Sequence, residues 1–465
     1  MFENVLGQAA AAQLIRDIEA GSLAPAMLFS GPPASGKGTA ALELGRVVSC
    51  EAGAKNAGAK TAGANFAEGG FAAWNCGCPA CSRHRFLIHP DLLCLGWKPF
   101  VAEISASAGA FLRDSASRNS SVSGGSANSP SRILFLRSVR KLLARFNPVL
   151  WEDDPRRSKV SPLVASLEEN LDELEQSGAG TQDASPEKLT EQILKSAVKL
   201  DSEAMSENIP VGHLRRAAWW SRLAPSGRWK LLIVENADLT QVEGRNSLLK
   251  LLEEPPGRMS IVLTTARPGS LLPTILSRLR PYRFGARDAA AEDEVIRRVF
   301  RDDVRGIRLS DYLDSFLPVS GETLEALASF YAASAAYKAV LISKKQGRKI
   351  AEEVVLLGKY CAPKAEAAGL GRPLGEISAV SALILERAEK FEIRSLFSRF
   401  LRSLLDQVSA SLKQAPSSFL PALAFHELWR DCTAWAESAV EIYELKPPQA
   451  LEKLFTDLSR GMAEL

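Results

Sequence analysis

The sequence predicts an α/β domain built on a parallel sheet, followed by an all-α part. Before residue 285, short apolar runs alternate with segments of helical spacing, which is the pattern of a parallel sheet covered on both faces. From Asp288 onward, every periodic segment has helical spacing. The stretch GPPASGKGT joins the first apolar run to a helix, in the order of strand, loop and helix that a phosphate-binding loop requires.

Each expected element rests on its own pattern. A continuous apolar run between turn residues predicts a buried strand, and apolar residues three or four positions apart predict a helix. Pro255-Pro256 marks the end of one such helix. The expected strands are Ala26–Ser30, Trp229–Val234 and Ile261–Thr265, and the expected helices before residue 285 are Ala9–Ala20, Thr39–Cys50, Val211–Leu223, Gly244–Glu254 and Leu272–Leu279.

Bulk properties exclude some classes of protein. The 465 residues are enough for about two to four domains, and 46% hydrophobic with 24% charged residues fits a globular protein. A net charge of +3 gives no global argument for a nucleic-acid or membrane partner. No apolar run is long enough to predict a membrane span, and MFENVLGQ does not resemble a secretory signal. We therefore expect a cytoplasmic protein with reduced cysteines.

The loop Gly31–Lys37 fits the pattern G-x-x-x-x-G-K. Its backbone N–H groups would surround phosphate, Lys37 would reach the outer phosphate oxygens, and the following helix would add its dipole. A Ser or Thr usually comes next and helps to hold Mg²⁺, but Gly38 stands there and Thr39 comes one residue later. The alternative is a Gly-rich turn that binds nothing.

The stretch LLIVENAD has the form of a Walker B strand, whose end carries the acids of an ATPase site. Glu235 can orient Mg²⁺, but Asn236 stands where a second acid would activate the attacking water, and an amide is no general base. Asp238 is expected to be structural. We therefore predict that hydrolysis is absent or very slow, whereas nucleotide binding stays open.

Four segments together resemble the clamp-loader branch of the AAA+ ATPases: WKLLIVENAD, NSLLKLLEEPP, IVLTTARP and LLPTILSRL, in family order and spacing. The N-terminal FENVLGQ resembles the segment that packs near adenine. His89-Pro90-Asp91 resembles the delta prime subunits of bacterial DNA polymerase III more than the gamma/tau subunits. The resemblance covers 1–97, 205–345 and 390–465, but not 98–204.

The resemblance implies three domains. Residues 1–285 would form the AAA+ nucleotide-binding domain, with a zinc-binding cysteine cluster at 50–84 and a long, partly disordered insertion at 98–204. Residues 286–345 would form a small helical lid, and 360–465 a helical collar for oligomerisation. The Ala/Gly-rich stretch Glu51–Ala73 is expected to be a loop, and the serine-rich stretch Ser115–Ser131 to be disordered.

The implied function is that of a subunit of the hetero-oligomeric clamp loader in DNA replication. Its partners would be the gamma/tau and delta subunits, the sliding clamp and primed DNA, and it would act as a rigid partner more than as a motor. Any DNA-directed DNA polymerase (nucleotidyltransferase) activity would belong to the holoenzyme. The alternatives are a motor ATPase of the gamma/tau kind, and a small-molecule kinase, since adenylate kinases also contain GKGT.

The resemblance also implies site residues. Ser277-Arg278 matches the motif whose arginine projects into the neighbouring subunit's site, so Arg278 would be an arginine finger in trans. The structural alternative is an arginine that donates hydrogen bonds to the last carbonyl groups of a helix. Leu324 stands where motor subunits carry a lid arginine. With ATP and Mg²⁺ as the candidate ligands, the nucleotide-binding positions would be Val5, Leu6, Gly31, Ser35, Gly36, Lys37, Gly38, Thr39, Glu235 and Thr265.

Four cysteines form a candidate structural zinc site. Cys78 and Cys81 have C-x-x-C spacing, and Cys50 and Cys76 precede them. Thiolates at this spacing can surround one tetrahedral Zn²⁺. The gap between Cys50 and Cys76 is longer than in the family, and a single residue separates Cys76 from Cys78, so His84 stays an alternative fourth ligand. The remaining alternative is a set of reduced cysteines without metal.

The basic segment RILFLRSVRKLLARF within 98–204 has two interpretations. One is a contact with DNA or the clamp. The other, which we favour, is an amphipathic helix that packs on the core and keeps a solvated basic face. The residues concerned are Arg132, Arg137, Arg140, Lys141 and Arg145.

Overall fold

The structure is a computed structural model of the chain. It describes all residues except 53–72, 120–128, 177–184, 206–207, 318, 390–393, 415–418 and 442–444. The chain divides into two compact units, Met1–Leu313 and Asp314–Leu465. The lid at 286–345 and the collar at 360–465 stay predictions.

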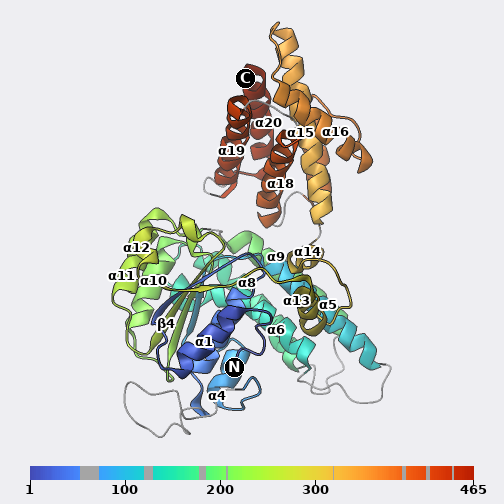
Figure 1. The fold of residues 1–465 in the computed structure, drawn as a ribbon. Coiled ribbons are helices and arrows are strands. Elements are labelled where there is room, and N and C mark those ends of the chain that lie inside the picture. Colours follow the sequence, from blue (N-terminus) through green and yellow to red (C-terminus); the bar gives the residue numbers. More distant parts are fainter. Residues whose placement is uncertain are drawn as a thin grey trace. The chain divides into compact units, whose positions relative to one another are not determined.

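A five-stranded sheet in the order β2-β3-β4-β1-β5 forms the centre of the first unit, and all its strands are parallel (Figure 1). The three strands expected from the sequence are the middle three. The two strands at the edges, β2 and β5, were not among the expected elements. The bounds are β1 Ala26–Ser30, β2 Leu92–Leu95, β3 Lys230–Val234, β4 Met259–Thr265 and β5 Arg280–Arg283.

The two faces of the sheet belong to two hydrophobic cores. In β1, Ala26 and Leu28 face one core, whereas Met27 and Phe29 face the other. The other strands alternate in the same way, because successive strand side chains point to opposite faces. Helices α1 (Ala9–Glu19) and α2 (Lys37–Val48) contribute to the second core. Burial on both faces explains why these strands read as continuous apolar runs.

The other core is filled largely by the segment predicted as an insertion. Its described parts are mostly helical, and they pack with the sheet and with α10 (Val211–Arg222) in one cluster. The predicted loop 51–73 lies almost wholly, and the predicted disorder at 115–131 largely, outside the described residues. The helices of the segment are α5 Phe100–Asn119, α6 Pro130–Leu143, the 3₁₀ turn η2 Ala144–Phe146, α7 Pro148–Trp151, α8 Arg157–Gln176 and α9 Pro186–Ala204.

The rest of the first unit follows the predicted order of elements. Of the C-x-x-C pair, Cys78 caps helix α4 and Cys81 lies within it, and α11 contains LLKLLE. Helix α2 begins at Lys37, two residues before the expected start, because the turn of the phosphate loop ends there. These elements are α4 Pro79–Arg85, η4 Ala237–Leu239, α11 Val242–Glu253, η5 Pro268–Ser270, α12 Pro273–Leu276, α13 Ala289–Val299 and α14 Leu309–Asp314, which reaches into the second unit.

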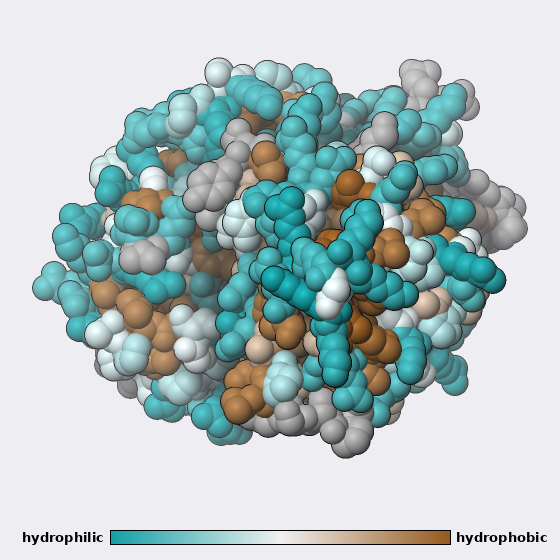
Figure 2. All heavy atoms as spheres, turned by 90° about the horizontal axis from the view of Figure 1, so that it is seen from above, coloured by the Kyte–Doolittle hydropathy of each residue, from teal (hydrophilic) through white to brown (hydrophobic). Residues whose placement is uncertain are grey.

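All regular elements among the described residues of the second unit are helices. Its central helix α15 (Gly321–Lys345) is long and apolar enough to span a membrane by composition, but 67% of its apolar stretch is buried inside the protein. Hydrophilic residues dominate the face shown in Figure 2, and hydrophobic residues form small separate groups there. The other helices are α16 Glu352–Ala367, α17 Ile377–Arg387, α18 Arg394–Leu412, α19 Phe419–Glu441 and α20 Pro447–Glu464.

Candidate nucleotide site and cysteine cluster

The phosphate loop connects the end of β1 to the start of α2. Gly31 must be glycine, since a Cβ there would lie 2.0 Å from the carbonyl oxygen of Phe284. Gly36 has φ +91°, a left-handed conformation that glycine adopts without strain. The predicted loop residues therefore have the conformation that the motif requires.

Lys37 turns back onto its own loop. Its Nζ donates to the carbonyl oxygens of Gly31 at 2.7 Å and Pro32 at 2.6 Å, and lies 3.3 Å from Ser35 Oγ. Burial lowers the pKa of Lys37 to about 8, against the opposing charges of Glu235 and Asp238. The ammonium group that the motif offers to phosphate is thus bonded within the loop.

The Walker B acid Glu235 follows β3 and lies directly against the start of α2. A Cβ on Gly38 would lie 2.4 Å from Glu235 Oε1, so a side chain at position 38 would have to displace this carboxylate. The other carboxylate oxygen, Oε2, is paired with Arg145 of η2. Burial would raise the pKa of Glu235, but Lys98, Arg145 and Lys141 outweigh it and lower that pKa.

These residues do not fit Mg²⁺. Proteins hold Mg²⁺ beside a nucleotide with a Ser or Thr hydroxyl and an acidic oxygen, together with phosphates and waters. Position 38 offers no hydroxyl, and the carboxylate of Glu235 already has a buried arginine as its counter-charge. Thr39, one residue on, is half-buried.

Asn236 has a structural role at the position of the second acid. Its φ of +49° is left-handed, a region that asparagine tolerates better than most residues. Its side-chain amide donates to the carbonyl of Trp97 at 2.8 Å, and its backbone N–H donates to Thr264 Oγ1 at 3.2 Å. The neighbouring Thr265 donates to Asp238 at 2.7 Å, as expected for a structural Asp238.

Arg145 and Arg287 lie at this site, and neither was among the predicted nucleotide-binding residues. Arg287 donates to the carbonyl of Leu6 at 3.1 Å and to that of Ala34 in the phosphate loop. It also lies close enough to Gly36 that a Cβ there would be 2.8 Å from its guanidinium. Val5 is buried beside the same glycine. No local motif marks either arginine in the sequence.

The basic side chains of α6 and η2 point into the protein. Arg137 donates to the carbonyl of Arg85, and Arg140 donates to that of Phe86 at 3.3 Å. Arg132 bonds the end of α8, and Lys141 pairs with Glu103. The preferred interpretation, packing on the core, agrees with these contacts, but the solvated basic face does not exist. The partners for this helix are carbonyl groups and the carboxylates of Glu103 and Glu175.

Arg278 is about one third exposed and has two partners within the chain. It donates to the carbonyl of Thr274 at 2.7 Å and pairs with Glu253 at 2.8 Å. The first contact is a hydrogen bond to a carbonyl near the end of a helix, as the structural alternative expects. An arginine finger would contact the nucleotide of another subunit, so this role of Arg278 stays a prediction. Leu324, at the predicted lid-arginine position, is a buried core residue of α15.

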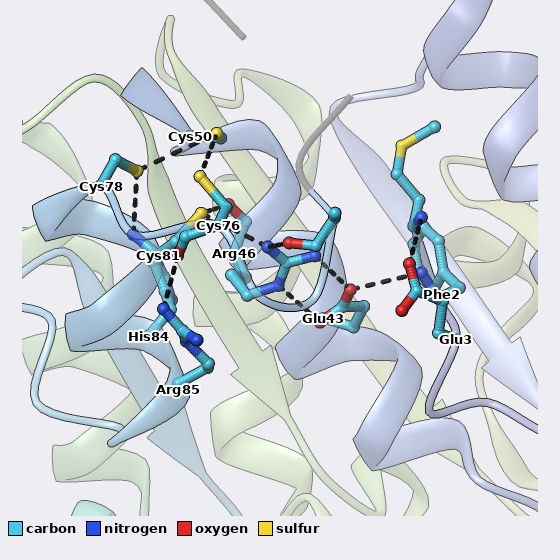
Figure 3. Close-up of polar contacts among 12 residues, drawn as sticks. Phe2, Glu3, Glu43, Arg46, Cys50, Cys76, Cys78, Cys81, His84 and Arg85 are labelled. Atoms are coloured by element: carbon cyan, nitrogen blue, oxygen red, sulfur yellow. Dashed lines mark hydrogen bonds and ion pairs between the residues drawn. The ribbon is translucent and has the colours of Figure 1, made fainter. Parts of the chain in front are cut away.

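The four cysteines lie together at the end of α2 and the start of α4. Their sulfur atoms all lie within 4.8 Å of one another and face one another in Figure 3. Cys50 Sγ is 3.8 Å from Cys76 Sγ and 4.0 Å from Cys78 Sγ. Four thiolates at the Zn–S bond length stand about 3.8 Å apart on a tetrahedron. The cluster therefore fits a structural metal such as zinc, with Cys76 among its members.

His84 lies outside this sulfur cluster. Its ring stacks on His89 at 4.1 Å between centroids, and neither ring nitrogen has a hydrogen-bond partner within the part of the chain that the structure describes. Burial lowers the pKa of His84 to about 3, with the nearby charges acting in the same direction. The alternative of His84 replacing Cys76 is not supported by this geometry.

The His89-Pro90-Asp91 motif connects the cluster to the sheet. The carboxylate of Asp91 accepts the backbone N–H groups of Ser226 at 2.9 Å and Gly227 at 2.6 Å. His89 Nδ1 accepts the N–H of Asp91 at 3.1 Å. The motif thus holds the loop that leads into β3, and through it the strand that ends at Glu235.

Comparison with known proteins finds a family match over part of the chain. The family model described as DNA polymerase III, delta subunit, matches residues 189–288, which run from α9 across β3 and β4 to the start of α13. The DNA polymerase III subunit delta prime of Pseudomonas aeruginosa is 35% identical over 98 residues. Over these parts the chain is similar to the delta and delta prime-type clamp-loader subunits of DNA polymerase III. The family match begins inside the predicted insertion.

Other relatives show how far the similarity extends. The DNA polymerase III subunit gamma/tau of Mycobacterium tuberculosis is 33% identical over 87 residues. The aligned part is 19% of this chain and 15% of the Mycobacterium tuberculosis protein. For the Pseudomonas aeruginosa protein, the aligned part is 21% of this chain and 28% of that protein. Among solved structures, a gamma subunit-related protein of Thermotoga maritima aligns over 60% of this chain and 90% of its own chain. The sequence identity is 18% and the TM-score is 0.24.

Proposed function

We propose that the chain is a delta prime-like subunit of the clamp loader, which helps to load the sliding clamp onto primed DNA in the cytoplasm and hydrolyses no ATP itself. The observation that carries this proposal is the end of β3. Glu235 is paired with Arg145 there, and Asn236 bonds the carbonyl of Trp97. A site without a free acid for Mg²⁺ and without a general base lacks the groups on which phosphoryl transfer depends.

The gamma/tau-type motor is the second candidate. The Mycobacterium tuberculosis gamma/tau relative supports it. It predicts that the isolated chain turns over ATP, and it leaves Asn236 and the buried Leu324 unexplained. A small-molecule kinase does not account for the family match. The other clamp-loader subunits, the clamp and primed DNA are therefore the proposed partners of either subunit type.

The test is reconstitution. The full chain is purified with candidate delta and gamma/tau subunits, and assembly and ATP turnover are measured for the complex and for the chain alone. We expect co-elution of the subunits, DNA-stimulated turnover by the complex and none by the chain. Turnover by the isolated chain at about 1 s⁻¹, the low end of enzyme rates, would show a motor. Failure to assemble would contradict the subunit assignment.

The trans role of Arg278 is tested in the same complex. Arginine fingers contribute roughly 10³-fold or more to the rate, so Arg278→Ala should lower DNA-stimulated turnover by about that factor while assembly is retained. Arg298→Ala is the matched control, because Arg298 is also a partly exposed arginine next to a single carboxylate, that of Glu294. Equal rates for the two variants would leave Arg278 as a helix-terminal residue.

A further inference from the structure

The turn η2 places Arg145 beside the Walker B acid from a distant part of the chain. Helix α6 ends at Leu143, and the backbone carbonyl of Arg145 accepts the indole N–H of Trp151 at 2.8 Å. The rings of Phe146 and Trp151 stack at 5.3 Å. The hydrogen bond and the stacked rings therefore hold the backbone around Arg145 in place. They fix the position from which its guanidinium extends.

Several further contacts hold the guanidinium itself. Its Nε donates to the carbonyl of Gly96 at 2.9 Å, and its Cζ lies 5.1 Å from the centre of the Phe100 ring. Gly96 has φ +89°, and a Cβ there would lie 2.0 Å from the carbonyl oxygen of Glu235. This glycine lets the two backbones come close enough for the buried pair to form. Both side chains of the pair are almost fully buried, Arg145 at 6% and Glu235 at 11% exposure.

A partly buried network lies beside the pair. Glu103 accepts from Lys98 at 2.7 Å and also pairs with Lys141, and all three charges act on Glu235. Three cations thus face two carboxylates, and a divalent ion added beside Glu235 would meet a positive surplus. Oε1 of Glu235 lies against the start of α2, since a Cβ added at Gly38 would be 2.4 Å from it, and Oε2 is paired with Arg145.

We propose that Arg145 is a built-in replacement for the divalent metal: it occupies the Mg²⁺ position at Glu235, and the site takes no divalent cation in any state of the loader. The inference rests on the proposed function and deepens it. The positive charge that neutralises Glu235 is then a side chain of the protein and not a bound ion. The arrangement of β3 and the phosphate loop therefore stays the same whether or not nucleotide and metal are present. Such a site suits a rigid partner in the ring.

The first test uses the unaltered, zinc-loaded full chain. Mn²⁺ is titrated with and without ATP and followed by electron paramagnetic resonance, and the melting temperature is measured with and without added Mg²⁺. No chelator is used, because it would also strip the cysteine site. We expect no stoichiometric Mn²⁺ binding and no shift of melting temperature with Mg²⁺. One tightly bound Mn²⁺ per chain, with or without ATP, overturns the inference.

The second test is a double-mutant cycle. Arg145→Ala leaves Glu235 buried and unpaired, so the melting temperature should fall by about 6 °C or more. Glu235→Ala in the same chain should recover part of that loss. Arg140→Ala is the matched control: Arg140 lies on the preceding helix α6 and pairs with Glu175 away from the site, and its loss should be much smaller. A double variant no more stable than Arg145→Ala alone overturns the pairing.

The two proposals fail separately. A chain that assembles into the loader but binds Mn²⁺ tightly overturns the metal replacement and leaves the subunit assignment intact. A chain that binds no Mn²⁺ but does not assemble with the other subunits overturns the assignment only.

Discussion

The phosphate loop and the cysteine cluster lie at opposite ends of α2, and they differ in what their polar atoms contact. At the loop end, Lys37 bonds carbonyl oxygens of its own loop, and Glu235 is paired with Arg145. At the other end, the four sulfur atoms face one another at distances that suit a tetrahedral metal. The charged groups at the start of α2 are thus paired with other groups of the chain. The sulfur atoms at its end instead surround one point, where a metal ion could lie.

The comparison teaches how a familiar motif should be judged. A motif states which groups are present, but a ligand binds only where those groups are not already satisfied by the protein. By that criterion the cysteine cluster is the better candidate for an ion site. The phosphate loop keeps its backbone form, because Gly31 and Gly36 are needed for the close packing and the turn, while its charged groups serve the fold.

The largest effect is expected from breaking the cysteine cluster. Cys81→Ser should abolish metal binding and destabilise α4, and we expect a loss of at least about 3 kcal/mol because structural zinc contributes folding free energy directly. Metal content, thermal unfolding and hydrogen exchange of Pro79–Arg85 measure it. Cys432→Ser is the control, since Cys432 lies outside the cluster. Wild-type protein with much less than about one zinc per chain would contradict the site.

The sequence was sufficient wherever the determinant is local. The middle strands are continuous apolar runs, and the phosphate loop is a contiguous motif, so both were predicted with nearly correct bounds. The edge strands are harder: β5 has a single buried residue, Tyr282, and is short and polar. The cysteine cluster was predicted as four residues even though a long stretch separates Cys50 from Cys76.

Contacts between distant segments could not be predicted. Arg145 and Glu235 are 90 residues apart, and nothing in either segment signals the other. Periodicity placed the basic residues of α6 on a helix, but it cannot tell whether their partner is water or a carbonyl group. The same limit applies to Arg287, whose partners are backbone atoms of Leu6 and Ala34. In a single sequence, such partners leave no pattern.

A smaller effect is expected from restoring the missing hydroxyl of the phosphate loop. Gly38→Ser places a Cβ where only 2.4 Å separates it from Glu235, so it should destabilise the protein by about 1–3 kcal/mol. The cost should shrink when Glu235 is also changed to Ala. Gly212→Ser is the control, because Gly212 is likewise the second residue of a helix but has open space around it. Equal unfolding free energies for the two serine variants would show that the site yields to a side chain at position 38.

An effect of similar size, but one that appears only as the pH changes, concerns the charge of Lys37. Its folded pKa of about 8 lies below the ordinary value of 10.5, so between those pH values the folded state binds fewer protons than the unfolded chain. Its contribution to the free energy of unfolding should therefore rise with pH, by about 2 kcal/mol between pH 8 and 10. Lys37→Met should lose that rise, whereas Lys188→Met, at an exposed position, should keep the wild-type profile.

Denaturant titrations of the three proteins across this pH range measure the difference. Subtracting the Lys37→Met curve from the wild-type curve removes the other titrating groups, which the two proteins share. A flat difference would mean that Lys37 stays fully charged and solvated in the folded chain. The loop would then still offer its ammonium group to an incoming phosphate, and the contrast between the two ends of α2 would be confined to Glu235 and Arg145.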